Sequence, residues 1–508
     1  MAQIHVTNLT YCYEGSFDNI FENVSFSIDT NWKLGFIGRN GKGKTTFLNI
    51  LLGKYEYQGS IATSTVFDYF PYPISEQEMG MCASELLDRI KPGCEEWRVI
   101  CELEKLGILA ELLYRPFRSL SHGERTKVLL AVLFSGDHDF LLIDEPTNHL
   151  DQESREVVKC YLSGKKGFIL VSHDRDILDA CVDHVLVLNR NSIEVQSGNF
   201  TSWWENKTRR DNFEKMENEK HLREIAALRK SVDQSRRWAD KNESTKIGFD
   251  PLKEPDRCIS TRAYIGAKTK KMQSRVKQYE KRMEREIQEK EGLLQDIENP
   301  VALKLYPMKY HKDRLISCKA ATIGYENGRQ DVLDNLSFEL MQGERVFLHG
   351  ENGCGKSTLI KTILSQAAGG KQDDIKITEG ALQTAAGLKI SYINQDTSFL
   401  KGDMTVYCAE HGLDESLFFA LLRQLDFERV QFTKRLEDFS EGQKKKVLIA
   451  SSLMTPAHLY IWDEPLNYID VFSRMQIEEL ILKYQPTMLL VDHDLRFREK
   501  IATRIVKL

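Results

Sequence analysis

Two segments of the sequence carry the residues of a phosphate-binding loop. Residues 38–47 read GRNGKGKTTF and residues 350–359 read GENGCGKSTL, and both fit the pattern GxxxxGK[ST]. In such a loop the backbone N–H groups and the lysine surround the phosphates, and the hydroxyl side chain binds Mg²⁺. An apolar run, residues 33–37, precedes the first loop and a helical pattern follows it, as a phosphate site at a helix N-terminus requires. The pattern predicts ATP and Mg²⁺ as cofactors.

The side chains of both loops have separate expected roles. Lys44 and Lys356 are expected to reach the β- and γ-phosphates, and Thr45 and Ser357 to ligate Mg²⁺. The other loop residues expected to bind ATP are Gly38, Asn40, Gly41, Gly43 and Thr46 in the first loop and Gly350, Asn352, Gly353, Gly355 and Thr358 in the second.

An acidic pair follows an apolar strand pattern at two places. Residues 140–143 lead into Asp144 and Glu145, and residues 459–462 lead into Asp463 and Glu464. A carboxylate at the end of a buried strand can complete the Mg²⁺ shell, and we expect Asp144 and Asp463 to do so. The two glutamates that follow are expected to orient or deprotonate the attacking water.

Two histidines, His173 and His493, each follow a further apolar run. A single histidine is more often structural than catalytic, but a histidine at equivalent places in two repeats is not in that class. We expect both to contact the γ-phosphate.

The order of these motifs reveals a duplicated domain. Lys44 recurs as Lys356, 312 positions later, and His173 recurs as His493, 320 positions later. Ser121 recurs as Ser440 and Glu145 as Glu464, each 319 positions later. A nearly constant offset across several motifs indicates an internal repeat rather than separate coincidences.

The composition fits a reducing compartment. The ten cysteines are scattered without a CxxC pair, so buried thiols are favoured over disulfides or zinc. The N-terminus lacks the basic and apolar stretches of a signal peptide, and no apolar run approaches the roughly 18 residues that span a bilayer. We therefore expect a cytoplasmic protein that does not bind a membrane.

Positive charge gathers between the repeats. The whole chain carries a net charge of −5, whereas residues 229–277 hold 14 basic and 6 acidic side chains. Helical apolar spacing occurs over residues 205–239 (Leu222, Ile225, Leu228 and Val232) and residues 266–297 (Met272, Val276, Tyr279, Met283 and Ile287). Proline and glycine between them predict an antiparallel helical hairpin with a loop at its tip.

The hairpin has two possible roles. A charged helical pair is by default a solvated spacer, but basic residues concentrated at the tip favour an anionic polymer as the target. The tip residues expected to contact it are Arg236, Arg237, Lys241, Lys246, Phe249, Lys268, Lys270 and Lys271.

These patterns predict an α/β protein with two tandem nucleotide-binding domains joined by a long α-helical hairpin. The expected boundaries are residues 1–204 for the first domain, 205–305 for the linker and 306–508 for the second domain.

The motif set as a whole resembles the ATP-binding-cassette (ABC) ATPases. It includes the phosphate loops, a Ser-x-Gly-[Glu/Gln] signature, Asp-Glu-Pro, an Asn-x-x-Asp turn and the histidines. Tandem cassettes with a charged helical linker and no membrane domain are similar to the ABC-F family of ribosome-associated proteins. The resemblance implies ATP hydrolysis to ADP and phosphate in a monomer whose two cassettes pair with each other.

The resemblance also implies further site residues. Each phosphate loop would face the signature of the other cassette, so the first site would take Ser440 and Gly442, and the second Ser121 and Gly123. Tyr13 and Tyr325 fall where the family stacks an aromatic ring on adenine, and Gln395 falls where it senses Mg²⁺ and the γ-phosphate.

The chain departs from the family pattern at several places. Tyr72 stands where the first repeat should have a glutamine, which puts ordinary metal coupling at the first site in doubt. His122 and Glu441 replace signature glycines, and Leu466 replaces the threonine seen at Thr147. Because every lysine, glutamate and histidine of the sites is present, both sites are expected to bind and split ATP.

The closest resemblance is to antibiotic-resistance members of the family, of the Lsa type. It implies binding to the bacterial ribosome, to rRNA and P-site tRNA, and release of lincosamides, pleuromutilins and streptogramin A from the peptidyl-transferase centre. A housekeeping ABC-F translation factor is the main alternative. The ATPase subunit of a transporter is less favoured, because it has no use for a basic hairpin between its cassettes. A DNA-repair ATPase is less favoured, because such proteins usually carry zinc-binding cysteine clusters or much longer coiled coils.

Overall fold

The computed structural model divides the chain into two compact units. One consists of Met1–Trp203 and Val301–Leu508, and the other of Trp204–Pro300. We call residues 3–203 the first repeat and residues 304–508 the second repeat. The described residues are 3–13, 19–136, 140–148, 150–189, 193–244, 274, 277–279, 281–283, 285, 304–325, 331–351, 353–369, 375–425, 427 and 429–508.

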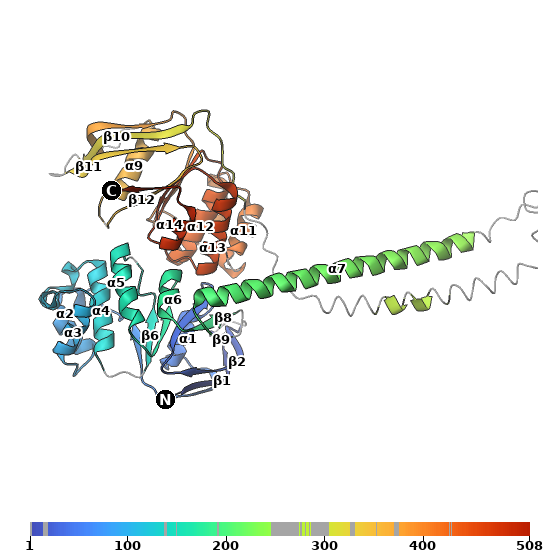
Figure 1. Cartoon of the computed structure of the whole chain (residues 1–508), viewed down its shortest axis with the longest axis horizontal. Coiled ribbons are helices and arrows are strands. Elements are labelled where there is room, and N and C mark those ends of the chain that lie inside the picture. The colour runs from blue at the N-terminus through green and yellow to red at the C-terminus, as the bar shows by residue number, and fades with distance from the viewer. Residues whose placement is uncertain are drawn as a thin grey trace, which may run out of the picture. The chain divides into compact units, whose positions relative to one another are not determined.

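A six-stranded sheet forms the centre of the first repeat (Figure 1). Its order is β5-β6-β7-β3-β8-β9, and all neighbours are parallel except β8 and β9. The inner strands are apolar runs because they are buried along their length. The strands are β3 (Lys33–Gly38), β5 (Phe67–Phe70), β6 (Phe140–Asp144), β7 (Phe168–Val171), β8 (His184–Leu188) and β9 (Ile193–Ser197).

A second, antiparallel sheet of the first repeat has the order β2-β1-β4. Its strands are β1 (Gln3–Tyr11), β2 (Phe21–Asp29) and β4 (Gln58–Ala62). Apolar residues of β1 and β2 form one core with Phe36 and Phe47. This core fixes the helix that follows the first phosphate-binding loop.

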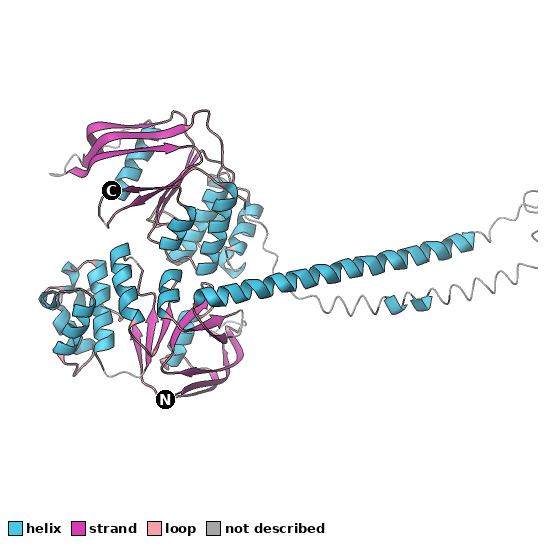
Figure 2. Ribbon diagram, viewed as in Figure 1, coloured by secondary structure: helices cyan, strands magenta, loops and turns pink. Residues whose placement is uncertain are grey.

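Helices of the first repeat connect the strands of the six-stranded sheet (Figure 2). They are α1 (Lys44–Leu51), α2 (Ala83–Ile90), α3 (Glu96–Lys105), α4 (His122–Ser135), α5 (Gln152–Ser163) and α6 (Arg175–Cys181). Short 3-10 helices are η1 (Glu78–Gly80), η2 (Ala110–Tyr114) and η3 (Phe117–Ser119).

The second repeat has the same architecture, with a five-stranded parallel sheet of order β14-β15-β16-β12-β17 and an antiparallel sheet of order β11-β10-β13. The predicted fold class is thereby confirmed. The strands are β10 (Arg314–Tyr325), β11 (Asp331–Met341), β12 (Arg345–His349), β13 (Ile375–Thr384), β14 (Ile390–Ile393), β15 (Leu459–Asp463), β16 (Met488–Val491) and β17 (Arg504–Lys507). The helices are α9 (Lys356–Ala367), α10 (Met404–Glu410), α11 (Glu415–Gln424), η5 (Arg429–Thr433), η6 (Leu436–Asp438), α12 (Glu441–Met454), α13 (Val471–Tyr484) and α14 (Leu495–Ile501).

The segment between the repeats begins with one long helix, α7 (Phe200–Ser244). It starts earlier than the predicted residue 205 because Phe200 and Trp203 are buried at its root. A second helical arm is described at residues 274, 277–279, 281–283 and 285. Ser231 and Tyr279 join the two arms by a 2.9 Å hydrogen bond between their hydroxyls.

The helix predicted for the first arm is confirmed, because the four apolar residues of the predicted spacing all lie in α7. Ile225 is buried, as is Met283 on the second arm, but Leu222 is 54% exposed. The less exposed face runs through Ile225, which is buried, and through Leu228 and Val232, which are half-buried. Of the predicted tip residues, Arg237 is exposed, and Arg236 and Lys241 lie in α7. Lys246, Phe249, Lys268, Lys270 and Lys271 lie outside the described residues.

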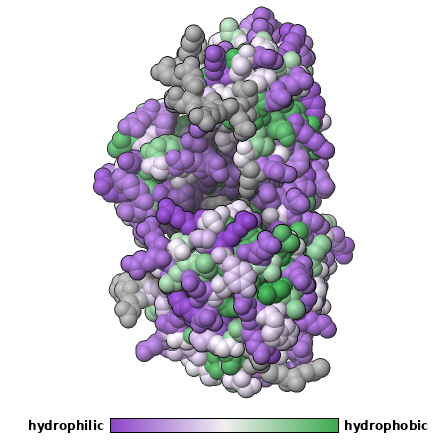
Figure 3. Space-filling model, turned by 90° about the vertical axis from the view of Figure 1, so that its left-hand side faces the viewer, coloured by the Kyte–Doolittle hydropathy of each residue, from purple (hydrophilic) through white to green (hydrophobic). Residues whose placement is uncertain are grey.

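Leu305, the last residue of the expected linker, is buried in the core of the second repeat. No helix in the described parts of the chain is long and apolar enough to cross a membrane. On the face drawn in Figure 3, hydrophilic side chains predominate and apolar side chains are scattered.

Candidate functional site

Both phosphate-binding loops hold their lysine in the same way. The Nζ atom of Lys44 donates to the carbonyl of Gly38 at 2.6 Å, and that of Lys356 donates to the carbonyl of Gly350 at 2.7 Å. Each lysine begins a helix, α1 or α9. The loops are therefore preformed around the lysines, with a helix N-terminus that favours anions.

The glycine before each lysine is required by the backbone. Gly43 and Gly355 have φ values of 104° and 98°, in the left-handed region that other residues rarely adopt. A Cβ atom at Gly43 would lie 2.5 Å from Ile20, and one at Gly355 would lie 2.8 Å from Val332. Of the other loop residues, Asn352 lies outside the described residues.

The predicted Mg²⁺ ligands lie together in both repeats. Thr45 donates from its hydroxyl to Asp144 at 3.1 Å, and Ser357 donates to Asp463 at 3.2 Å. The second carboxylate oxygen of Asp463, Oδ1, is buried and has no hydrogen-bond partner among the described residues. A hydroxyl beside a carboxylate with a spare oxygen fits a hard cation such as Mg²⁺.

The predicted catalytic glutamates and histidines form matching pairs. The Nε2 atom of His173 lies 3.3 Å from Oε1 of Glu145, and that of His493 lies 3.5 Å from Oε1 of Glu464. Both glutamates have left-handed backbone angles, with φ of 50° and 47°. Strained backbone of this kind is common where a side chain must be aimed at a reacting group.

The electrostatic environments of the two glutamates differ. Burial, together with the neighbouring Asp144, raises the pKa of Glu145 to about 8. Burial also acts on Glu464, but its hydrogen bond from His493 and the charge of Lys445 bring its pKa below the usual value. The two sites therefore differ in charge although their residues match.

Charges of the second repeat also affect the pKa values of residues in the first site. Burial lowers the pKa of Lys44, and the negative charge of Asp470 is the strongest of the effects that act to raise it. Burial lowers the pKa of His173 well below its usual value, and the positive charges of Lys44 and Arg474 act in the same direction. His173 is therefore neutral at physiological pH and can accept a proton or donate a hydrogen bond.

The two tyrosines expected to stack on adenine stand beside the loops. Tyr13 forms a 2.6 Å hydrogen bond with Thr46, and Tyr325 forms a 3.0 Å hydrogen bond with Thr358. Their rings are 44% and 40% exposed. Each ring is thus fixed at its hydroxyl end and leaves a surface that a purine could cover.

The signature serines cap the helices that follow them. Ser121 accepts from the backbone N–H of Glu124 at 3.2 Å, and Ser440 accepts from that of Gln443 at 3.4 Å. Glu124 and Gln443 return the bond to the backbone of the serines, which makes two capping boxes. Glu441, which replaces a signature glycine, accepts from the hydroxyl of Thr397 at 2.6 Å.

A cavity of about 380 Å³ brings the first loop to the second signature. Its lining combines groups of both repeats, as the family resemblance implies for the first site. It includes Asn40, Gly41, Glu145, Asn148 and His173 from the first repeat and Ser440, Glu441, Gly442, Lys446 and Tyr468 from the second.

The second loop opens on a different cavity, of about 500 Å³. Its lining comes from the second repeat alone and consists of Tyr325, Val332, Gly353, Gly355, Lys356, Ser357, Thr358, Gln395, Glu464 and His493. Ser121 and Gly123 do not line it. Of the two expected pairings of loop and signature, the structure brings together the first.

Gln395 and Tyr72, which fall at equivalent places in the two repeats, have different hydrogen-bond partners. Gln395 donates to Oε2 of Glu464 at 3.0 Å. Tyr72 instead donates to Asp68, and Tyr69 donates to Oδ2 of Asp144 at 3.2 Å. In the first site, the hydroxyl of Tyr69 therefore contacts Asp144, the carboxylate expected to bind Mg²⁺. In the second site, the amide of Gln395 contacts Glu464 instead.

Sequence reasoning placed Asp470 only in an Asn-x-x-Asp turn and gave it no role, and it missed Lys445. Asp470 is fully buried and pairs with Lys446 at 3.1 Å. Lys445 is buried, and its charge acts on Asp463 and Glu464. The signal was present, because lysine inside a helix that is otherwise apolar is seldom buried without an acidic neighbour.

Comparison with known proteins agrees with this geometry. The sequence profile of the family described as ABC transporter matches residues 21–148 and 333–467. The chain is 27% identical over 504 residues to the ribosome protection protein VmlR of Bacillus subtilis, covering 97% of this chain and 85% of that protein. It is 28% identical to the ATP-binding protein Uup of Buchnera aphidicola, covering 99% and 80%.

Solved structures share the fold at lower identity. The archaeal ribosome recycling factor aABCE1, in complex with the stalk protein aP1, superposes with a TM-score of 0.59 at 17% identity, over 98% of this chain and 87% of that chain. A structure titled RNase-L Inhibitor gives 0.59 at 18% identity, over 99% and 87%. Together with the two profile matches, one in each repeat, these findings place the chain. It belongs to the ABC transporter family, as an ATP-binding protein and ATPase of the ABC-F type with two cassettes.

Proposed function

We propose that this protein binds the bacterial ribosome and uses ATP to free the peptidyl-transferase centre of lincosamide, pleuromutilin and streptogramin A antibiotics. The linker would enter from the exit-site side, beside P-site tRNA, and dislodge the drug. The observation that carries the proposal is the 27% identity with the ribosome protection protein VmlR, because it extends over 97% of this chain, linker included.

The linker supports a nucleic-acid target. Residues 229–277 carry 14 basic and 6 acidic side chains. In the described part, α7 exposes Arg223, Arg229, Lys230 and Arg237, and the contact between Ser231 and Tyr279 pairs the two arms. A rigid paired helix with exposed cations suits a phosphate-rich surface better than a flexible tether does.

The two nucleotide sites would supply the energy. We propose that Lys44 and Lys356 bind the phosphates, that Asp144 and Asp463 hold Mg²⁺ with Thr45 and Ser357, and that Glu145 and Glu464 act on water. A bound Mg²⁺ would neutralise charge between the β- and γ-phosphates. The imidazoles of His173 and His493 would then hold the γ-phosphate in place.

A housekeeping translation factor of the ABC-F type is the second candidate, because the same linker charge and the same ATPase would serve it. A transporter subunit is disfavoured, since the linker would have no partner there. Only the ribosome-protection role predicts that the protein changes drug susceptibility, so a growth assay with and without drug can separate the two roles.

The test is drug susceptibility of a sensitive bacterium with and without the chain. Expression should raise the inhibitory concentration of at least one of the three drug classes. The double variant E145Q/E464Q is the matched control, because it should bind ATP without turnover and give no protection. An unchanged susceptibility to all three classes, with an altered growth rate in the absence of drug, would favour the housekeeping role.

Ribosome binding should be tested separately by co-sedimentation at several salt concentrations. Affinity should fall as salt rises, because phosphate contacts release counterions. Neutralising Arg236, Arg237, Lys268, Lys270 and Lys271 together should lower affinity and flatten that dependence. If affinity is unchanged, the linker is a spacer.

The loop between the arms can be tested directly, although it lies outside the described residues. Phe249→Ala, or deletion of residues 248–253, should abolish drug protection and leave ATPase turnover intact. Loss of both activities would assign the loop a structural role, and intact protection would remove it from the mechanism.

A further inference from the structure

One buried ion pair joins the two repeats. The guanidinium of Arg175, at the start of α6, contacts both carboxylate oxygens of Glu478 in α13, one of them at 3.2 Å. Arg175 is 5% exposed and Glu478 is 0% exposed. Because the pair is bidentate and shielded from water, it fixes the relative orientation of the two helices.

The duplicated sequence allows a comparison of this pair with its counterpart. Arg175 follows Asp174, the N-cap of α6, just as Leu495 follows Asp494, the N-cap of α14. Glu478 lies eight residues after Asp470, the N-cap of α13. At the same distance after Asp151, the N-cap of α5, stands Lys159.

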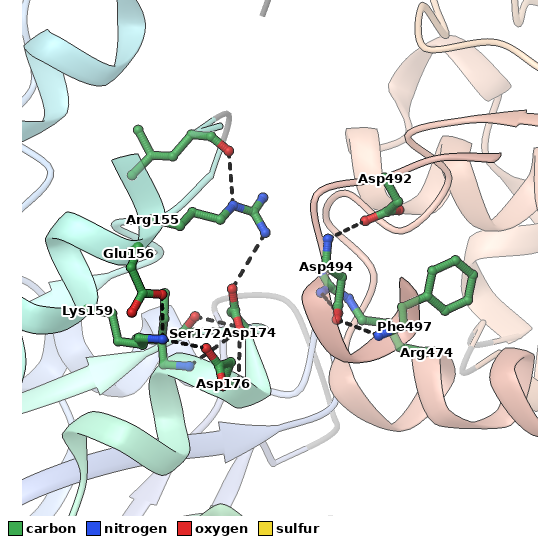
Figure 4. Close-up of polar contacts among 12 residues, drawn as sticks. Arg155, Glu156, Lys159, Ser172, Asp174, Asp176, Arg474, Asp492, Asp494 and Phe497 are labelled. Carbon is green, nitrogen blue, oxygen red and sulfur yellow. Dashed lines mark hydrogen bonds and ion pairs between the residues drawn. The ribbon is translucent and has the colours of Figure 1, made fainter. Parts of the chain in front are cut away.

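The counterpart therefore has no charges that could attract each other. Leu495 and Lys159 line one small cavity together with His493 and Asp174. Figure 4 shows this region, with Lys159 turned toward acidic side chains of its own repeat. Its Nζ atom lies 2.5 Å from Glu156 and 2.9 Å from Asp176.

Other features are alike on the two sides, which isolates the difference. Arg155 lies 3.5 Å from Asp174 in the first repeat, and Arg474 lies 3.0 Å from Asp494 in the second (Figure 4). These equivalent ion pairs connect α5 or α13 to the N-cap of the helix that follows the histidine of the same repeat. The ion pair within each repeat is therefore common to both, whereas the ion pair between Arg175 and Glu478 has no equivalent on the other side.

The ion pair lies beside the first site. Arg175 is two residues from His173, and α13, which carries Glu478, begins after Asp470 and Tyr468. His173, Tyr468 and the signature residues Ser440 and Gly442 line the same cavity. Lys159 and Leu495, in contrast, lie on the side of His493, where the cavity at the second loop has no lining from the first repeat.

Two arginines of α14 also contact the first repeat. Arg496 binds Asp179, which joins α14 to α6, and Arg498 donates to the side-chain oxygen of Gln152 at 3.0 Å. The second of these contacts lies on the side of the second site and joins an arginine to a neutral amide. It is weaker than an ion pair with a buried carboxylate, so it does not offset the missing charge at Leu495.

We propose that Arg175 and Glu478 are positioning residues for the first ATP site, which they hold assembled without nucleotide, while the second site opens and closes. The first site then binds ATP in a preformed arrangement. The second site must bring the signature of the first repeat to its loop in every cycle, so its ATP affinity includes the unfavourable step of closing.

The experiment measures ATP binding at each site separately in the full chain. Lys356→Ala leaves the first site to be titrated with ATP and Mg²⁺, and Lys44→Ala leaves the second. Arg175→Gln in the first background should raise the dissociation constant by about tenfold, since the assembled fraction falls. The same substitution in the second background should leave the dissociation constant unchanged.

Two exchanges separate positioning from general stability. The swapped pair R175E/E478R, made together with K500Q because Lys500 also contacts Glu478 at 3.1 Å, should restore affinity at the first site. The pair K159E/L495R, combined with E156Q and D176N so that the new glutamate does not face two carboxylates, should create the missing contact and lower the dissociation constant of the second site by about tenfold. Equal weakening of both sites by Arg175→Gln, or a swap that restores the melting temperature but not the affinity, would overturn the proposal. So would an unchanged second site in the combined variant that carries K159E/L495R.

Discussion

Asn40, in the phosphate-binding loop of the first repeat, donates a 2.6 Å hydrogen bond from its side-chain amide to the backbone carbonyl of Tyr468 in the second. Tyr468 has a φ of 63°, which turns its carbonyl away from the ordinary helical direction. The bond ties the loop that would hold phosphate to the turn beside the opposite signature. Asn352, the equivalent of Asn40, lies outside the described residues.

The same carbonyl explains why one signature glycine should matter more than the other. A Cβ atom at Gly442 would lie 2.7 Å from the carbonyl oxygen of Tyr468, which is backbone, whereas one at Gly123 would lie 3.2 Å from the hydroxyl of Ser154. Gly442→Ala should therefore displace the first site and reduce ATP turnover by about tenfold or more. Gly123→Ala should have a smaller effect, since a serine can rotate. Steady-state ATPase assays of both variants decide this, and equal losses would contradict it.

The glutamates should be needed for hydrolysis but not for nucleotide binding. Replacing Glu145 and Glu464 by Gln keeps their size and removes the carboxyl groups that are expected to orient or deprotonate the water, so turnover should fall by about 100-fold or more. ATP should still bind, because the lysines and the loop backbones are unchanged. Phosphate release and equilibrium binding of ATP are the two measurements. Turnover at the parental rate in the double variant would mean that other groups activate the water.

The parts of this structure that the sequence predicts well are those set by short spacing along the chain. A loop, a lysine and a helix in succession have one workable arrangement, so the contacts of Lys44 and Lys356 with the first loop carbonyl follow from the motif. The ends of parallel strands meet at one edge of a sheet, which places Asp144 and Asp463 beside Thr45 and Ser357. The fold class follows from the same patterns.

Contacts between distant segments were not predictable in this way. Arg175 and Glu478 are 303 positions apart, and neither belongs to a motif. The clue was an inequality between the repeats, since Leu495 and Lys159 occupy the equivalent positions. On α7, apolar residues at helical spacing did not reveal which of them faces the other arm, because the helix is charged all round and Leu222 is exposed.

We expect Tyr69 to lower the affinity of the first site for Mg²⁺ relative to the second. Its hydroxyl donates to Asp144 at 3.2 Å, and Thr45 donates to the same oxygen. Its counterpart Tyr392 donates to Asn394 instead. A metal must displace the donor from the carboxylate, so Tyr69→Phe should lower the Mg²⁺ concentration for half-maximal activity by about three- to tenfold, as for one hydrogen bond with a net contribution of about 1 kcal/mol.

The measurement is a Mg²⁺ titration of ATPase activity in the Lys356→Ala background, where only the first site is intact. Tyr392→Phe in the Lys44→Ala background is the matched control and should leave the titration of the second site unchanged. A higher Mg²⁺ requirement in Tyr69→Phe would show that the hydroxyl orients Asp144 for the metal instead of competing with it.

Asp470 should make the folded protein sensitive to acid. Burial acts to raise its pKa, but the positive charge of Lys446 and the backbone N–H of Ser473 hold the pKa well below the usual value. A carboxyl group whose pKa is depressed on folding stabilises the protein above its unfolded pKa, which is about 3.9. That stability is lost as the pH falls toward the folded value.

Asp470→Asn should therefore destabilise the protein at pH 7 by about 3–5 kcal/mol, since it leaves Lys446 buried without its counter-charge. The difference from the parent should narrow below about pH 4, where the Asp470 carboxylate of the unfolded parent takes up a proton while that of the folded parent is still ionised. Asp151→Asn is the matched control, because Asp151 caps α5 in the same way but is only partly buried, so its loss should cost less at pH 7. Denaturant unfolding at several pH values measures both. A constant difference between Asp470→Asn and the parent from pH 7 to pH 3 would show that local packing or hydrogen bonding at this position, and not the charge, carries the stability.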